Sequence, residues 1–410
     1  MSLLAVLVAA AAAAQSPVAS PSGCPQRLCF AEHLRPFFEA LAAREAEDDP
    51  LHILQIGDSH TAGDMITNGW RIPLQARYGR GGRGVLAAGQ PYDGYLTWGV
   101  TASQSPGWSV NGIYGRAWAN YGQPVGISGF TQTARGAGEY LGIVTDTPEH
   151  NFDRITVCAI KQPGAGTVIM RMGYQAESWA LDSHSREPAC RSMESDYPVS
   201  AASLTTADDR VVSITSFGTF RKRGGVVVSN LGVSGTQLIH MAREDDSVMR
   251  AEFEAYDPDL VVLAFGTNEG FSMELSVYQY EADLRNQVNR IRRLAGDDVP
   301  ILLIGAPDAA TRNARLAANG GRAASVCDEG WMTPTLLGDI RHRQMVMAEQ
   351  LGLAFWDWNA AMGGRCSAHG WRLREFMRGD HVHFTPEGGL EIGRILFGDL
   401  ERAAAMARGD

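Results

Sequence analysis

The chain contains several short, mostly apolar runs of residues, and each run precedes a helical segment. This alternation constrains the fold more than any other feature. The runs cover residues 51–56, 226–229, 260–265, 301–304 and 353–356. The run 260–265 contains no polar residue, which is typical of a parallel strand buried on both faces. Strands that alternate with helices predict an α/β fold in which helices cover both faces of a parallel sheet.

The expected helices follow from apolar spacing and from stop signals. They cover residues 30–47, 64–78, 236–249, 335–351 and 386–405. A further helix carries Leu284, Val288, Ile291 and Leu294 at helical spacing and stops near Gly296.

Residues 95–221 interrupt this alternation. They are rich in Gly, Ser and Thr, contain no convincing helix, and include short strand-like segments at 154–160, 167–170 and 210–214. This composition predicts a β-sandwich. We therefore expect an α/β domain made of residues 28–94 and 223–405, interrupted by an inserted all-β domain over residues 95–222.

Composition excludes some classes of protein and favours export. The chain of 410 residues is 45% hydrophobic and 20% charged, as expected of a well-cored protein, and its net charge of -10 argues against nucleic-acid binding. Residues 3–14 form an apolar run that suits a signal peptide ending at residue 14 and is too short to span a membrane. An uncleaved buried helix is the alternative. No later stretch predicts a transmembrane helix, so a periplasmic or secreted protein is expected.

The cysteines favour disulfides. None of the six forms a Cys-x-x-Cys pair, so zinc is not indicated, and an even number behind an export signal is typical of disulfide bonding. Pairing neighbours along the chain would join Cys24 to Cys29, Cys158 to Cys190 and Cys327 to Cys366. Buried free thiols in a cytosolic protein are the alternative.

The first candidate for chemistry is Ser59. Gly57-Asp58-Ser59-His60 directly follows the first predicted strand. Ligands of open α/β sheets bind outside the carboxyl ends of the strands, so Ser59 would lie where a nucleophile is needed. Backbone amides at the following helix start are free to donate hydrogen bonds. A serine here is also common as a helix N-cap without chemistry.

A candidate acid–base pair precedes the last predicted helix, in Asp380-His381-Val382-His383. The spacing allows the Asp380 carboxylate to accept from one imidazole nitrogen of His383 while the other nitrogen faces a serine. His381 is the rival base, but its place next to Asp380 makes the same hydrogen bond harder. A histidine that only caps or packs at the surface is the other alternative.

Two further segments follow strands. Gly266-Thr267-Asn268-Glu269 follows the run 260–265, and the Asn268 amide there can donate to an oxyanion. Residues 230–235 follow the preceding run, and Gly235 allows a bare backbone amide to approach a substrate. Each segment alone also fits a simple turn.

Taken together, these four segments resemble the sequence blocks of the SGNH (GDSL-type) hydrolase superfamily. The resemblance implies a flavodoxin-like, three-layer α/β domain with serine esterase activity. It implies that Ser59 attacks the ester carbonyl, that His383 is general base and then general acid, and that Asp380 orients His383. The amides of Ser59 and Gly235 and the Asn268 side chain would form the oxyanion hole. An acetyl-Ser59 intermediate would be hydrolysed, and no metal or organic cofactor would be needed.

Two strings narrow the resemblance: Ile-Gly-Asp-Ser-His-Thr-Ala-Gly-Asp at 56–64 and Trp-Gly-Val-Thr-Ala-Ser at 98–103. Both resemble the peptidoglycan O-acetylesterases of Gram-negative bacteria, which carry a carbohydrate-binding-like β-sandwich inserted in an SGNH domain. The resemblance implies periplasmic removal of acetyl groups from the C6 hydroxyl of N-acetylmuramic acid in peptidoglycan. His60 departs from the superfamily pattern, since many lipase-type members carry Leu there.

Aromatic residues gather at the start of the predicted insertion. They fit either stacking on sugar rings or, for most of them, a β-sandwich core. They are Tyr95, Trp98, Trp108, Tyr114, Trp118 and Tyr121.

Other functions stay open at this stage. One is an esterase for another acetylated polysaccharide, such as xylan or an exopolysaccharide. Another is a catalytically inactive glycan-binding protein, although the complete set of candidate residues argues against it. A lipase is disfavoured because no long apolar lid-like stretch is present. With His383 as the base, activity should fall at acid pH, because a protonated imidazole cannot accept the serine proton.

Overall fold

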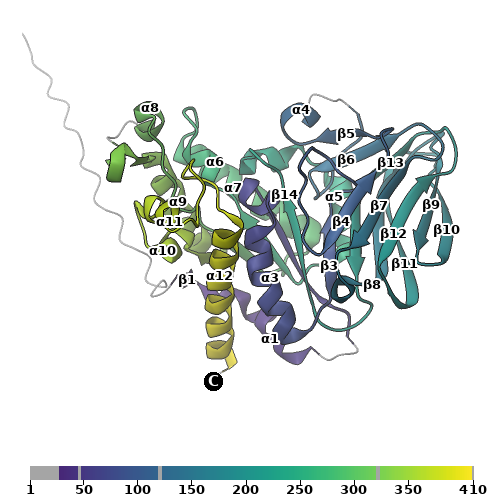
Figure 1. The fold of residues 1–410 in the computed structure, drawn as a ribbon, viewed down its shortest axis with the longest axis horizontal. Coiled ribbons are helices and arrows are strands. Elements are labelled where there is room, and N and C mark those ends of the chain that lie inside the picture. Colours follow the sequence, from purple (N-terminus) through teal and green to yellow (C-terminus); the bar gives the residue numbers. More distant parts are fainter. Residues whose placement is uncertain (1–26, 45–47, 119–121, 320–323, 409–410) are drawn as a thin grey trace, which may run out of the picture.

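The computed structural model describes residues 27–44, 48–118, 122–319 and 324–408 (Figure 1). An α/β part is built from segments near both ends of the chain, and an all-strand part is built from the segment between them. The expected signal peptide, residues 1–14, lies outside the described residues.

The α/β part contains one six-stranded sheet in the order β1-β19-β16-β15-β2-β14. Its strands are β1 (Leu28–Cys29), β2 (Leu51–Gly57), β14 (Val226–Gly232), β15 (Leu260–Ala264), β16 (Ile301–Ile304) and β19 (Ala354–Trp356). The short edge strand β1 is antiparallel to β19, and the other neighbours are parallel. Numbered along the chain, the parallel strands lie in the flavodoxin-like order 2-1-3-4-5. The predicted parallel α/β fold is confirmed.

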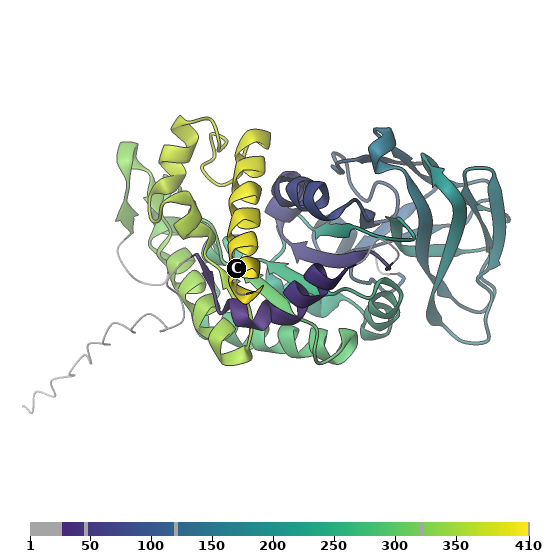
Figure 2. The same ribbon diagram turned by 90° about the horizontal axis from the view of Figure 1, so that it is seen from below.

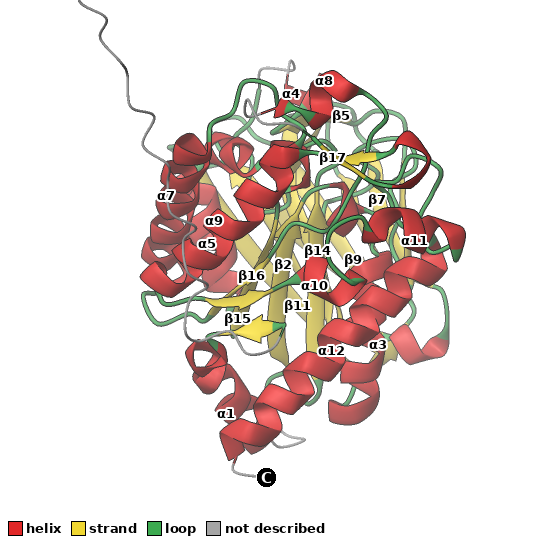
Figure 3. Ribbon diagram, turned by 90° about the vertical axis from the view of Figure 1, so that its left-hand side faces the viewer, coloured by secondary structure: helices red, strands yellow, loops and turns green. Residues whose placement is uncertain are grey.

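Helices cover both faces of this sheet (Figures 2 and 3). Successive side chains of a strand point to opposite faces, so β2 gives Ile53 to one apolar cluster and Leu54 to the other. The first cluster lies under α1 (Arg35–Ala43), α3 (Met65–Tyr78), α10 (Trp358–Met362), α11 (Ser367–Leu373) and α12 (Pro386–Arg408). The second lies under η3 (Leu238–Arg243), α5 (Asp246–Tyr256), α7 (Val277–Ala295) and α9 (Thr335–Leu351).

The all-strand part consists of two antiparallel sheets whose buried side chains form one shared apolar cluster. One sheet has the order β10-β9-β12-β7-β4 and the other β11-β8-β13-β6-β5, with β3 pairing to β13. The strands are β3 (Gly82–Leu86), β4 (Val100–Gln104), β5 (Ser109–Gly112), β6 (Phe130–Ala134), β7 (Tyr140–Thr145), β8 (Phe152–Lys161), β9 (Thr167–Met172), β10 (Gln175–Ala180), β11 (Glu187–Val199), β12 (Ala201–Thr206) and β13 (Val212–Phe220). Strand β3 precedes the expected boundary at residue 95. One short helix, α4 (Gly115–Trp118), was not expected.

Two predicted helices differ from the structure. The expected helix 236–249 is wrong, because η3 ends at Glu244 in extended backbone and Asp245 then caps a new helix, α5, by accepting from Ser247 N and Val248 N. The expected helix 30–47 begins as the 3-10 turn η1 (Ala31–Leu34) and continues as α1, which ends at Ala43.

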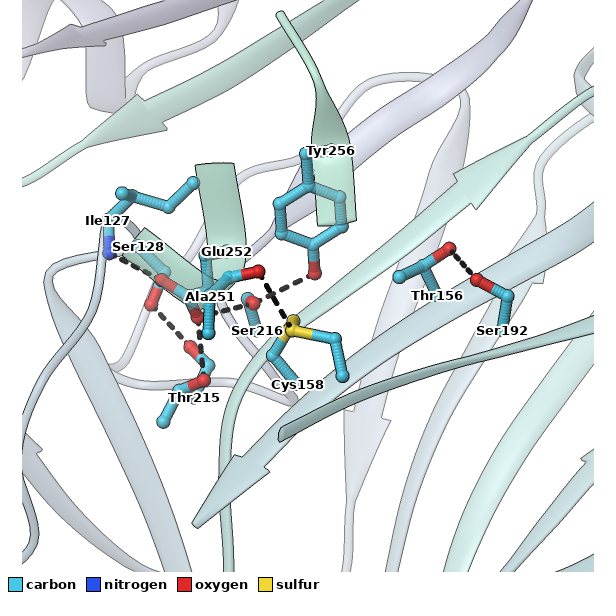
Figure 4. The surroundings of a disulfide bond; sticks show 11 residues. Ile127, Ser128, Thr156, Cys158, Ser192, Thr215, Ser216, Ala251, Glu252 and Tyr256 are labelled. Atoms are coloured by element: carbon cyan, nitrogen blue, oxygen red, sulfur yellow. Dashed lines mark hydrogen bonds between the residues drawn. A yellow bond between two sulfur atoms is a disulfide. The ribbon is translucent and has the colours of Figure 1, made fainter. Parts of the chain in front are cut away.

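Helix α5 connects the two parts of the molecule. The buried carboxylate of Glu252 accepts hydrogen bonds from Thr215 Oγ1 and Ser216 Oγ, each at 2.6 Å, and from Ile127 N at 2.7 Å (Figure 4). Burial raises the pKa of Glu252 above its ordinary value, although these hydrogen bonds oppose the shift. A helix of the α/β part is thereby fixed to β13 of the all-strand part.

Two of the three predicted disulfides are confirmed. Cys158 of β8 pairs with Cys190 of β11, close to the hydrogen bonds of Glu252 (Figure 4), and Cys327 pairs with Cys366. The third prediction involves Cys24, which lies outside the described residues. In the described part of the chain, no helix is long and apolar enough to cross a membrane.

Candidate active site

Ser59 lies at the carboxyl end of β2, as the first residue of the short helix α2 (Ser59–Ala62). The N-cap of this helix is Asp58, whose Oδ1 accepts from His60 N at 2.9 Å. The alternative that Ser59 serves as the N-cap is therefore wrong. The turn is tight at Gly57, where a Cβ would lie 2.6 Å from Ala264 O of the neighbouring strand.

Ser59, His383 and Asp380 form a hydrogen-bonded chain. Ser59 Oγ lies 3.1 Å from His383 Nε2, and His383 Nδ1 lies 2.8 Å from Asp380 Oδ2. Asp380 Oδ1 also accepts from the backbone amides of Val382 and His383, each at 2.9 Å. Partial burial raises the pKa of Asp380, but these hydrogen bonds outweigh it and hold the pKa below its ordinary value. An ionised Asp380 fixes the tautomer of His383 that leaves Nε2 free to accept a proton from Ser59.

His381, the rival base, points elsewhere. Its φ of 57° is in the left-handed region, its ring stacks on Trp331 at 3.6 Å between centroids, and its Nε2 lies 3.2 Å from His369 Nδ1. The sequence-based preference for His383 agrees with this geometry.

The candidate oxyanion residues lie on the loops after β14 and β15. Ser234 lines the same cavity as Ser59, and Gly235 follows it with a φ of 83°. Asn268 lies in α6 (Thr267–Gly270), and its Nδ2 donates to Thr236 O at 2.8 Å. An amide group carries two hydrogens, so this bond fixes the side chain and leaves a second N–H available.

Glu269, a buried residue to which the sequence analysis gave no role, fixes these two loops. Glu269 accepts from Leu238 N at 2.7 Å and from Gly266 N at 3.0 Å. Burial raises the pKa of Glu269 to about 7. Glu269 thus ties the loop that follows β15 to the start of η3.

His60, noted only as a departure from the superfamily pattern, is buried directly behind His383. Its Nε2 donates to Val382 O at 2.9 Å, and its Nδ1 lies 3.4 Å from Asp58 Oδ1 and 3.3 Å from Thr267 Oγ1. Burial lowers the pKa of His60, but the interactions with Asp58 and Val382 reverse this effect and leave it raised. His60 therefore holds the backbone next to His383.

Asp64 is a third residue without a role in the sequence analysis. It is fully buried and accepts from Arg71 at 2.8 Å, Arg83 at 2.7 Å, Asn230 at 2.9 Å and Trp98 N at 2.9 Å. Burial raises the pKa of Asp64, but the guanidinium groups of Arg71 and Arg83 outweigh this effect. The net pKa lies below its ordinary value, so Asp64 stays ionised. This cluster joins the segment after Ser59 to β14 and to the loop that precedes β4.

A cavity of about 220 Å³ opens at Ser59. Besides Ser59 and His383, its lining includes Tyr92 and Leu96 from the loop after β3, and Arg378 from the loop before α12. Within the described residues, no three His, Cys, Asp or Glu side chains are grouped so that they could hold a metal ion.

Comparisons with known proteins relate part of the chain to one hydrolase family and its fold to one solved esterase. Residues 217–389 match the GDSL-like Lipase/Acylhydrolase family, a range that contains Gly235, Asn268, Asp380 and His383 and begins after Ser59. No curated protein matches the chain. A solved structure titled as a peptidoglycan O-acetylesterase in action superposes with a TM-score of 0.74 at 24% identity, covering 94% of this chain and all of that one.

Other solved structures are more distant. An active-site mutant of a family two carbohydrate esterase from Clostridium thermocellum has a TM-score of 0.28 at 13% identity, covering 73% of this chain and 98% of that one. A family 3 carbohydrate esterase from Talaromyces cellulolyticus has a TM-score of 0.30 at 14% identity, covering 44% and 72%.

The family match over residues 217–389 supports a carboxylic ester hydrolase similar to the GDSL-like Lipase/Acylhydrolase family. Among such hydrolases, the chain resembles the peptidoglycan O-acetylesterases, whose fold it shares over nearly its whole length.

Proposed function

We propose that this chain is a serine esterase that removes O-acetyl groups from peptidoglycan, at the C6 hydroxyl of N-acetylmuramic acid. The observation that carries the esterase proposal is the unbroken hydrogen-bonded chain from Ser59 through His383 to Asp380. The substrate is supported by the likeness to a structure titled as a peptidoglycan O-acetylesterase.

In the proposed mechanism, Ser59 Oγ attacks the acetyl carbonyl carbon and its proton passes to His383 Nε2. The tetrahedral intermediate collapses, the C–O bond to the sugar breaks, and the sugar oxygen takes the proton from Nε2. Water then attacks acetyl-Ser59, with His383 again as base, and acetate leaves as Ser59 regains its proton. Asp380 stabilises the imidazolium in both steps.

The proposed oxyanion hole consists of the Ser59 and Gly235 amides and the second N–H of Asn268. It is supported by the position of Ser59 in the first turn of α2, where amides have no helical partner, and by the bonds that fix Asn268.

We further propose that β3 to β13 form an inserted β-sandwich of carbohydrate-binding type between two segments of the hydrolase domain. The shared core of the two antiparallel sheets supports a sandwich. The start at β3 differs from the sequence-based boundary at residue 95. A periplasmic or secreted location is supported by the two disulfides, which persist in oxidising compartments.

The test is acetate release from O-acetylated peptidoglycan, with base-treated peptidoglycan as the control. We expect release only from the acetylated polymer. No release from it, alongside activity on acetylxylan or an acetylated exopolysaccharide, would replace the cell-wall substrate with another acetylated polysaccharide.

A further inference from the structure

A second cavity, larger than the one at Ser59, opens directly beside it. Its volume is about 750 Å³, and it shares Tyr92, Gly94 and Ser234 with the Ser59 cavity. The two cavities are therefore neighbours with a shared wall. The transferred acetyl group needs only the smaller cavity, so the larger one is available to the rest of the substrate.

Both parts of the molecule form the walls of this second cavity, which we call the trench. Val233 and Ser234 come from the segment after β14, whereas Val110, Ala117 and Phe130 come from the all-strand part. The side chains that line the trench are thus largely apolar. The exposed side chains of Arg116 and Asp93 add opposite charges to the lining.

Tyr114 stands at the junction of the trench and the candidate oxyanion loop. Its ring lies 4.7 Å from the His240 ring between centroids, and a Cβ built on Gly235 would lie 2.5 Å from Tyr114 Cε1. Despite these contacts, Tyr114 is 38% exposed. A partly exposed aromatic ring that neighbouring residues hold in place is suited to stacking on a flat, weakly polar ring.

We propose that the trench binds the glycan chain next to the acetylated sugar, with a pyranose ring stacked on Tyr114. This inference rests on the proposed function, because it takes the substrate to be a polymer. A pyranose ring has apolar faces that match Tyr114 and Phe130, and hydroxyl and N-acetyl groups that can reach Arg116 and Asp93. A trench for a fatty acyl chain would have no use for these two charged side chains. The all-strand part would then supply a specificity-determining residue as well as a wall.

The proposal predicts that Tyr114→Ala affects the polymer more than a small ester. We would measure kcat/KM for acetate release from O-acetylated peptidoglycan and for hydrolysis of 4-nitrophenyl acetate, using the full chain. The ratio of the two values should fall about tenfold, since truncating an aromatic anchor commonly costs more than 1 kcal/mol. Tyr114→Phe keeps the ring and should hold the ratio within about twofold of wild type.

The matched control is Tyr174→Ala, which removes a 96% exposed tyrosine from the hairpin between β9 and β10 and should change neither activity. If Tyr114→Ala does not fold, Arg116→Ala at the trench should lower the same ratio about threefold.

Other outcomes would overturn the proposal. An unchanged ratio in Tyr114→Ala or Arg116→Ala would remove the trench from substrate binding and leave the esterase proposal intact. A larger loss on 4-nitrophenyl octanoate than on the polymer would show an acyl chain as the occupant. A wild-type enzyme that hydrolyses 4-nitrophenyl acetate but releases nothing from the polymer would remove the cell-wall substrate and the trench proposal together.

Discussion

Two histidines close to Ser59 have opposite surroundings. The side chain of His383 is 41% exposed and lines the cavity at Ser59, whereas His60 is buried and its ring nitrogens lie close to Val382 O and Thr267 Oγ1. Because Val382 O accepts a hydrogen bond from His60, the backbone next to His383 is held in place. His60 is therefore a positioning residue and not a second base.

Replacing His60 with Leu should lower kcat by about ten- to a hundredfold with little change in KM, since small misplacements of a catalytic group have effects of this size. His60→Gln retains a donor for Val382 O and should recover part of the loss. Hydrolysis of 4-nitrophenyl acetate measures both parameters.

The control for this prediction is His184→Ala, which changes an exposed histidine far along the chain. Full kcat in His60→Leu, or a loss confined to KM, would contradict the positioning role.

Ser59→Ala tests the nucleophile directly and separates an esterase from an inactive glycan-binding protein. We expect kcat to fall by at least about a thousandfold, because no other group can form the acyl intermediate. Binding to peptidoglycan, measured by co-sedimentation, should persist. Residual activity near that of wild type would exclude Ser59 as the nucleophile.

At the scale of elements, prediction from sequence worked where local signals decide the structure. The unbroken apolar run 260–265 predicted a strand, and the structure has β15 there. Ser59, Asp380 and His383 could be proposed as candidates because they follow a strand or share one short segment, and the structure brings them within hydrogen-bond distance of one another. No role was predicted for His60, Asp64 or Glu269, because at least one partner of each lies well outside its own segment. Val382, for example, lies 322 positions from His60.

The segment 236–249 shows how capping overrides periodicity. Its apolar spacing predicted one helix, but Asp245 starts a new one, and this break lets Glu244 turn inward. Glu244 is buried with Oε2 3.9 Å from Arg290 NH1. Burial raises the pKa of Glu244 to about 8, and the nearby Arg290 opposes that shift.

This pKa makes stability depend on pH. Between the ordinary value of 4.5 and the folded value of about 8, the folded state binds the proton more strongly than the unfolded chain. The free energy of unfolding should therefore fall as pH rises, by at most about 1.4 kcal/mol per pH unit from this group. Urea unfolding of Glu244→Gln between pH 5 and 8 should show a weaker decline than wild type. Parallel curves for the two proteins would show that Glu244 does not titrate in this range.

At the scale of the whole molecule, the buried carboxylate of Glu252 is one of the contacts that couple the two parts. Glu252→Ala would leave Thr215, Ser216 and Ile127 N without their buried acceptor. We expect the free energy of unfolding to fall by about 2–4 kcal/mol, since each unpaired buried polar group carries a desolvation cost. Urea unfolding followed by tryptophan fluorescence measures this change.

Glu254→Ala, two residues away on the exposed side of α5, is the control and should change stability by less than about 0.5 kcal/mol. A similarly small effect of Glu252→Ala would mean that other contacts hold the two parts together.

The pairing of Gly82 with Phe220 has a consequence for how the chain folds. Leu51 of β2 pairs with Val226 of β14, and the whole all-strand part lies between them in the sequence. Once that part has folded, its two ends lie side by side, and the loop that the parallel sheet must close becomes roughly fivefold shorter, which lowers the entropic cost by about 1.4 kcal/mol. The antiparallel sheets would then form first during synthesis and hold β14 close to β2, so that the two strands can pair.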